Sequence, residues 1–196
     1  MKTFIKNTLT LVVISSIVLS CAPQSSQTVE SPRDSVNQDD KNGNAANIAQ
    51  SKSDPEFALY AADGGMLEVR LGDLALQKAL SPEVKSFAQS MVTDHGKANE
   101  ELKILAAKLN LSIPAALSAT SQQKYDAIAQ KDGEDFDRAY ADAMVSDHKE
   151  TIESFYVQAN KGSGSEISEW AKAKVPILEH HLMMAKKMYD VVKKSE

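Results

Sequence analysis

The spacing of apolar residues in the C-terminal three quarters of the chain most constrains its fold. In two long segments they recur three or four positions apart, so each segment would bury one continuous stripe as a helix. The stripe in residues 82–109 consists of Val84, Phe87, Met91, His95, Ala98, Leu102, Leu105 and Leu109. The stripe in residues 165–194 consists of Ile167, Trp170, Lys174, Leu178, His181, Ala185, Met188 and Val192. No alternating run is long enough for a strand, and the sequence therefore predicts an all-α protein.

Start and stop signals divide this region into four long helices. Asp54-Pro55-Glu56 and Ser81-Pro82-Glu83 each place a capping residue, a proline and an acid at a helix start. We expect helices at about 55–80, 82–109, 134–160 and 165–194, with Pro176 bending the last one. The connection 110–133 between the second and third helices is long and has room for one short helix near 121–130. A long middle connection permits a crossover, which predicts a ferritin-like four-helix bundle.

A short internal repeat supports two related helical hairpins. The segment Ala88-Gln-Ser-Met-Val-Thr-Asp-His95 matches Ala141-Asp-Ala-Met-Val-Ser-Asp-His148 at an offset of 53 residues. Ferritin-like bundles are commonly built from two hairpins related by pseudo-symmetry, so the repeat agrees with the predicted fold.

The N-terminus has the pattern of an export signal. Lys2 and Lys6 precede an apolar run of about a dozen residues, which is too short for a membrane-spanning helix. Val18-Leu19-Ser20-Cys21 resembles a bacterial lipobox, although an ordinary signal peptide with an incidental Cys is the alternative. We expect a lipoprotein signal peptide at residues 1–20, a lipidated Cys21 with a disordered linker at 21–53, and the bundle at 54–196.

Lipidation would make the membrane a partner of this chain, because acyl chains on Cys21 supply a stable anchor. By resemblance to lipoprotein sorting rules, Ala22 after the Cys is not an inner-membrane retention signal. We therefore expect a protein of the bacterial cell envelope, held in the outer membrane and facing the periplasm or the cell surface.

Charge and cysteine content exclude several classes of protein. The chain has 27 acidic and 22 basic side chains, a net charge of -5 and one Cys. This balance offers no broad basic face for nucleic acid. One Cys excludes an internal disulfide framework and a Cys-based zinc or iron–sulfur site.

Four polar residues fall at the midpoints of the four predicted helices. They are Glu68, His95, His148 and His181, one from each helix in chain order. Because midpoints of antiparallel helices of similar length share one level, we expect these side chains to meet inside the bundle. His180 is rotated by about 100° from His181 and should point outward.

Three imidazoles and one carboxylate are a ligand set for one divalent transition metal such as zinc, copper or iron. Asp94, Asp147 and Glu179 lie one or two positions from the histidines and can supply hydrogen bonds to them or a further ligand. The alternative is a buried polar layer without metal, in which Glu68 hydrogen-bonds the histidines and fixes helix register. Methionines one turn from the histidines favour copper, but Met also fills irregular cores; they are Met91, Met144 and Met184.

Several of these motifs together resemble one protein family. They are Met91-Val-Thr-Asp94-His95 with Leu102, Phe136-Asp137-x-x-Tyr140 before Asp147-His148, Pro176-x-Leu178-x-x-His181-Leu182, and Glu68-Val69 with Gly72 and Ala75. The pattern resembles the domain-of-unknown-function 4142 family over about Asp54 to Tyr189. The resemblance implies a ferritin-like bundle in the outer membrane or periplasm and implies no particular reaction.

No catalytic motif accompanies this fold. The chain has no Gly-x-Ser-x-Gly turn, no phosphate-binding glycine loop and no Glu-x-x-His, the pattern of di-iron carboxylate bundles. The sequence therefore predicts a non-enzymatic envelope lipoprotein whose bundle binds one metal ion, in metal handling or stress protection. The alternative is a structural or protein-interaction lipoprotein whose histidines only set helix register.

Overall fold

The computed structural model describes residues 52–162 and 164–194, all within the compact unit Ala45–Glu196. These residues form five helices: α1 (Asp54–Lys78), α2 (Pro82–Lys108), α3 (Ala119–Ala129), α4 (Gly133–Ala159) and α5 (Glu166–Lys193). The predicted signal peptide, Cys21 and nearly all of the predicted linker lie outside the described residues. No helix in the described ranges has the length and apolar character that crossing a membrane requires.

Capping side chains set the helix ends close to the predicted positions. The cap of α1 is Ser53 and not Asp54, because Ser53 and Glu56 form a reciprocal capping box. The backbone N–H of Ser53 donates to Glu56 Oε2 at 2.8 Å, and Asp54 becomes the first helical residue. Ser81, Ser118 and Ser165 cap α2, α3 and α5 in a similar way.

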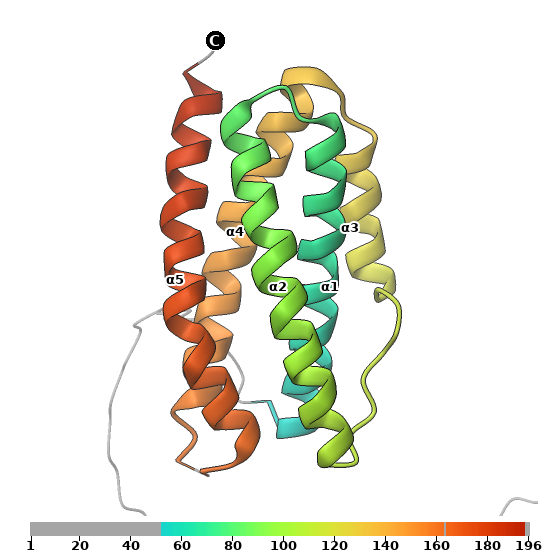
Figure 1. Ribbon diagram of the computed structural model, residues 1–196, viewed down its shortest axis with the longest axis vertical. Coiled ribbons are helices and arrows are strands. Elements are labelled where there is room, and N and C mark those ends of the chain that lie inside the picture. The colour runs from blue at the N-terminus through green and yellow to red at the C-terminus, as the bar shows by residue number, and fades with distance from the viewer. Residues whose placement is uncertain (1–51, 163, 195–196) are drawn as a thin grey trace, which may run out of the picture. The chain divides into compact units, whose positions relative to one another are not determined.

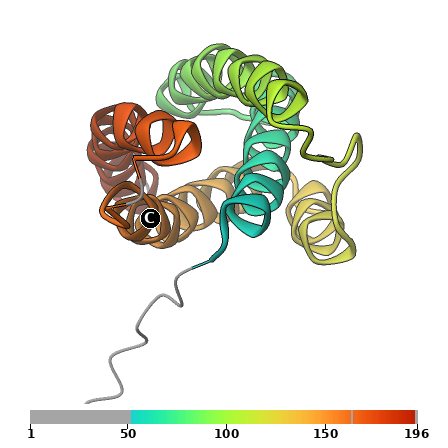
Figure 2. The ribbon, with the colours of Figure 1, turned by 90° about the horizontal axis from the view of Figure 1, so that it is seen from below.

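The four long helices form a bundle, with α1 packed along α2 and α4 packed along α5. Seen along the bundle axis, the order around the ring is α1, α2, α5 and α4 (Figure 2). The crossover that contains α3 makes α2 and α4 run in the same direction (Figure 1). The prediction of an all-α, ferritin-like four-helix bundle is confirmed, and the sequence repeat occupies the two parallel helices α2 and α4.

Polar contacts hold α3 against the outside of α1 and α4. Asp63 on α1 accepts hydrogen bonds from the Ser118 backbone N–H and the Ser121 hydroxyl, each at 2.7 Å. Lys124 on α3 reaches Asp147 on α4 at 2.9 Å. These bonds fix the long connection along the bundle.

The apolar core is divided into two clusters. One contains Leu71, Phe87 and Tyr140, and the other contains Phe57 and Leu102 together with apolar residues from the start of α5. Each long helix contributes to both clusters and places a buried polar residue near the level where one cluster gives way to the other. These residues are Glu68, His95, His148 and His181. The predicted polar layer is therefore present at the predicted level.

A glycine allows α1 and α2 to approach closely above this layer. A Cβ added to Gly72 would lie 2.8 Å from Val92 Cγ2 and 3.1 Å from the Ala88 carbonyl oxygen. Gly64, also on α1, has no atom within 4 Å of such a Cβ. The small residue is required for helix packing at position 72 and not at position 64.

We predict opposite effects of alanine at these two positions. Gly72→Ala should lower the free energy of unfolding by about 1–3 kcal/mol, because the added methyl forces the helices apart. Gly64→Ala should raise it by up to about 1 kcal/mol through helix propensity alone. Urea unfolding of both variants tests this, and equal stability of the two would contradict the packing argument.

Candidate metal centre

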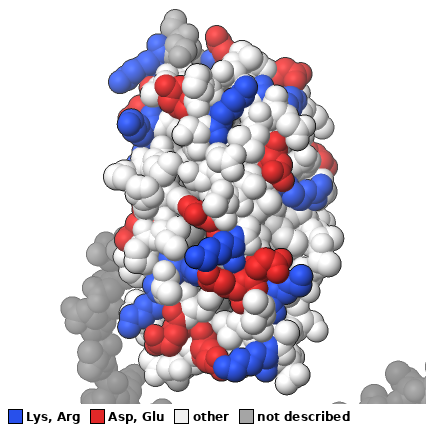
Figure 3. All heavy atoms as spheres, viewed as in Figure 1, with Lys and Arg blue, Asp and Glu red and all other residues white. Residues whose placement is uncertain are grey.

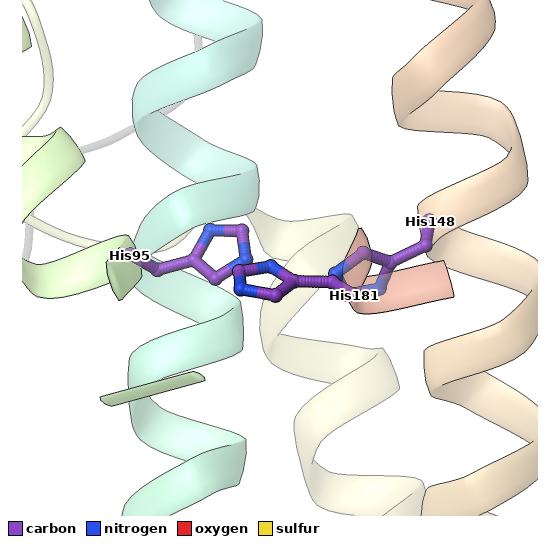
Figure 4. Close-up of side chains that lie close together, drawn as sticks. All are labelled: His95, His148 and His181. Atoms are coloured by element: carbon purple, nitrogen blue, oxygen red, sulfur yellow. The ribbon is translucent and has the colours of Figure 1, made fainter. Parts of the chain in front are cut away.

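Three histidines from three helices converge on one point in the bundle (Figure 4). His95 lies on α2, His148 on α4 and His181 on α5. The distances between ring centroids are 5.3 Å for His95–His181, 5.5 Å for His148–His181 and 5.6 Å for His95–His148. One ligand atom from each residue lies within 4.8 Å of the other two. These atoms are close enough to be considered ligands of one ion.

Each ring presents a buried nitrogen that has no hydrogen-bond partner among the described residues. The three atoms are His95 Nε2, His148 Nε2 and His181 Nδ1. For two of the rings the other nitrogen is bonded: His148 Nδ1 lies 2.9 Å from the Met144 carbonyl oxygen, and His181 Nε2 lies 2.9 Å from Asp94 Oδ2. Since a carbonyl or carboxylate oxygen accepts, these bonded nitrogens carry the proton, and in the neutral rings of His148 and His181 the unpaired nitrogen carries a lone pair.

Burial keeps the three imidazoles neutral at pH 7. Desolvation lowers the pKa of His148 from 6.5 to about 4 and lowers the pKa of His95 well below its ordinary value. Desolvation also lowers the pKa of His181, although the Asp94 carboxylate opposes this effect. Neutral imidazole is the form that binds a metal ion, so the cluster needs no deprotonation before it can bind.

Glu68 lies beside the cluster but is not part of the group of mutually close ligand atoms. Its Oε1 is 3.8 Å from His148 Nδ1, the nitrogen already bonded to Met144, and its buried Oε2 has no hydrogen-bond partner in the part of the chain that the structure describes. Burial, with a smaller contribution from Asp147, raises the Glu68 pKa from 4.5 to about 8. At pH 7 the carboxyl is mostly protonated and His148 is neutral, so this contact is not an ion pair.

The three neighbouring acidic residues are placed in different ways. Asp94 orients His181 through the 2.9 Å hydrogen bond. Asp147 pairs with Lys124 and lines the cavity beside the histidines. Glu179 is not near the cluster: it is exposed and accepts a hydrogen bond from Tyr156 at 2.6 Å. Two residues span about 200° around a helix, which turns Glu179 away from His181.

The remaining histidine and the methionines near the cluster differ in their burial. His180 is exposed, as predicted from its rotation relative to His181. Met91 and Met144 are fully buried within an apolar cluster, whereas Met184 is partly buried against it. These environments agree with a core-filling role for the methionines.

A cavity of about 200 Å³ adjoins the histidines. Its wall includes all three imidazoles and Glu68, and its lining extends to side chains that are exposed on the surface. These exposed lining residues are Asp94, Lys97, Lys124, Glu150 and Ile177. The buried cluster is therefore connected to the surface of the bundle.

The sequence did not predict that Lys124 and Lys97 line the cavity beside the histidines. Lys124 belongs to the crossover helix, whose position against α1 and α4 depends on bonds between distant residues. Lys97 is an exposed helical lysine, and such residues usually mark only a solvated surface. No local sequence signal distinguishes either residue from other surface lysines.

The visible surface has mixed charge. On the face shown in Figure 3, acidic and basic side chains are interspersed without a large area of one sign. This face therefore agrees with the mild net charge of -5.

The fold and the site define a ferritin-like four-helix bundle with a buried three-histidine cluster. The family described as a domain of unknown function (DUF4142) matches residues 39–188. The chain belongs to this family, as its sequence motifs indicate. A search of curated proteins found no match.

Solved structures with a similar fold include three forms of CopM. The Cu(I)-bound form has 19% sequence identity, covers 71% of this chain and 96% of its own, and has a TM-score of 0.60. The Cu(II)-bound form has 18% identity, coverages of 72% and 98%, and a TM-score of 0.61. The silver-bound form has 20% identity, coverages of 72% and 97%, and a TM-score of 0.59. At this level of identity the similarity shows a shared fold.

The Glu68 carboxyl should make stability depend on pH in the metal-free protein. Its pKa is about 8 when folded against 4.5 ordinarily, so between these values the folded chain binds more protons than the unfolded chain. Its contribution to stability is present below about pH 4.5 and is lost as pH rises toward 8. Glu68→Gln should remove this dependence, so the variant gains stability relative to wild type by up to a few kcal/mol between pH 5 and pH 8.

Urea unfolding of both metal-free proteins at pH 5 and pH 8 measures this difference. The comparison cancels the titration of the histidines, which is common to both chains. A stability difference that does not change with pH would show that Glu68 ionises normally in the folded protein.

Proposed function

We propose that this protein binds one transition-metal ion through His95, His148 and His181 and handles that metal in the cell envelope. The observation that carries the proposal is the close approach of one ligand atom from each of three buried histidines, each of which also has a buried nitrogen without a hydrogen-bond partner among the described residues. Two of the rings are already oriented by hydrogen bonds from their other nitrogen. Such outer bonds typically fix the orientation of metal-binding histidines.

The geometry of the cluster fits one ion. If the three ligand atoms are at their outer separation of 4.8 Å, the central point is about 2.8 Å from each, against roughly 2.0–2.1 Å for a bond from zinc to histidine. Small ring movements of under about 1 Å would therefore bring the nitrogens to bonding distance. We propose that Glu68, predicted as a ligand, lies beside the ion without binding it, because its carboxyl contacts the Nδ1 side of His148.

Copper is the first metal to test. Neutral imidazole suits zinc, copper and iron, so the ligands alone leave these three open. CopM, which has the same fold, has been solved with Cu(I), Cu(II) and silver bound. This likeness supports copper, and zinc and iron are the competing metals in the experiment.

A purely structural role for the histidines is the alternative. In that case the polar layer should satisfy its own hydrogen bonds, because an unpaired buried polar group costs about 1–3 kcal/mol. The three ring nitrogens have no such partner among the described residues. Glu68 Oε1 is 3.8 Å from His148 Nδ1, which is too far for a hydrogen bond. The unpaired nitrogens favour metal binding over a role in which the histidines only fix helix register.

We further propose that the bundle is attached to the outer membrane through a lipid on Cys21. The proposal rests on the sequence alone: the charged and apolar start, the lipobox-like residues 18–21 and the polar linker. A non-enzymatic role in metal handling or stress protection follows from a binding site without catalytic motifs.

Metal titration should separate binding at this site from binding elsewhere. We expect the purified full-length chain to bind one equivalent of copper with a Kd below about 1 μM. His95→Ala or His148→Ala should weaken binding at least about tenfold, a loss of about 1.4 kcal/mol. His180→Ala is the matched control, because this exposed histidine lies beside His181 and should leave binding unchanged.

Competition with a chelator of known affinity, repeated with zinc and Fe(II), ranks the metals. Circular dichroism of each variant shows whether the bundle is folded. Full copper binding by a folded His148→Ala variant would refute the site. Glu68→Gln in the same titration tests whether Glu68 is a ligand, and we expect it to weaken binding less than His148→Ala does.

The anchoring proposal has a separate test in cells. Cys21→Ser in the full-length chain should remove the protein from the membrane fraction or leave the precursor unprocessed, because the acyl anchor cannot form. Cell fractionation with immunoblotting measures this, and Ser20→Ala, next to the same position, is the control. If the Cys21→Ser protein is processed like the wild type and still fractionates with the membrane, the lipid anchor is contradicted.

A further inference from the structure

We propose that the metal ion keeps one coordination position open toward the adjoining cavity, and that a small anion from solution binds there. This inference rests on the proposed three-histidine metal site. It adds a ligand that the protein does not itself supply and gives the cavity a function.

The set of ligand atoms leaves a position to be filled. Among the described residues, the group of mutually close ligand atoms contains three histidines and no carboxylate. Zinc sites with three protein ligands keep a fourth position for water or substrate. Glu68 contacts His148 on its Nδ1 side, away from the unpaired Nε2 that would face an ion.

The cavity has a suitable size and position for that ligand. Its wall includes all three histidines, and its volume is about 200 Å³. One water needs only roughly 10–15 Å³ by such a measure, whereas pockets for drug-sized ligands start near 300 Å³. The space therefore suits a ligand of a few atoms, and the exposed lining residues connect it to solvent.

Charge favours an anion as that ligand. Three neutral imidazoles do not compensate the charge of the ion, and the Glu68 carboxyl contacts His148 on its Nδ1 side, away from the nitrogen that would bind the ion. A buried charge is costly unless it is paired. Asp94 is already bonded to His181, and Asp147 is paired with Lys124. The lining carries both signs of charge, so the ion itself, and not the rim, provides the attraction.

Azide is a suitable probe because its binding to Cu(II) produces a charge-transfer absorption band. The full-length chain is first loaded with one equivalent of Cu(II), and loading is measured by metal analysis after removal of free ion. We expect azide to produce a saturable band at one equivalent per copper. Loaded protein whose spectrum does not respond to azide would overturn the open position while leaving the metal site intact.

Cavity-filling variants test whether the anion reaches the ion through this space. Gly64→Leu on α1 and Ala98→Leu on α2 add bulk at two positions of the lining, and a Cβ at Gly64 meets no atom of the described residues within 4 Å. Gly96→Leu is the matched control, because a Cβ there is equally free of contacts and Gly96 does not line the cavity.

We expect either filling variant to retain copper and to weaken azide binding at least tenfold, with wild-type azide binding in Gly96→Leu. Equal azide binding in both filling variants and the control would overturn the role of the cavity. Failure of the wild-type chain to retain copper, zinc or iron would overturn the proposed metal site and this inference together, and metal analysis identifies that result before azide is added.

Discussion

Burial of three neutral imidazoles between two apolar clusters is the constraint on which the centre of this bundle depends. Each histidine loses hydration and gains at most one protein hydrogen bond, so the layer is costly to bury. The apolar clusters on either side hold the helices at the spacing that keeps the rings together. A bound cation would give all three unpaired nitrogens a partner at once, which supports the proposed metal site.

The same burial decides the chemistry that the site can perform. Desolvation keeps the histidines unprotonated and the Glu68 carboxyl protonated near neutral pH. The site is therefore prepared for a cation without first releasing protons from its imidazoles. The crossover helix α3 adds Lys124 to the wall of the adjoining cavity, so the segment that sets the topology also shapes access to the site.

The sequence predicted much of the fold because helix signals are local. Ser81-Pro82-Glu83 and the apolar stripes depend on residues within a few positions of one another, and these boundaries agree closely with the structure. Ser53 and Asp54 can both accept a hydrogen bond from the backbone at a helix start. Ser53 is the cap of α1 because the Glu56 side chain bonds back to the Ser53 backbone N–H. The level of the histidines followed from helix lengths, which local signals also set.

The sequence by itself determined which residues face inward and at what height, because 100° per residue and 1.5 Å per residue are fixed by helix geometry. Only the tertiary structure decided which ring nitrogen each histidine presents, because this depends on the contacts of His148 with Met144 and of His181 with Asp94. It also decided that Glu68 lies beside the three histidines, that Glu179 bonds Tyr156, and that Lys124 reaches the cavity. These outcomes depend on side-chain rotation and on contacts between distant segments, which helix periodicity does not encode.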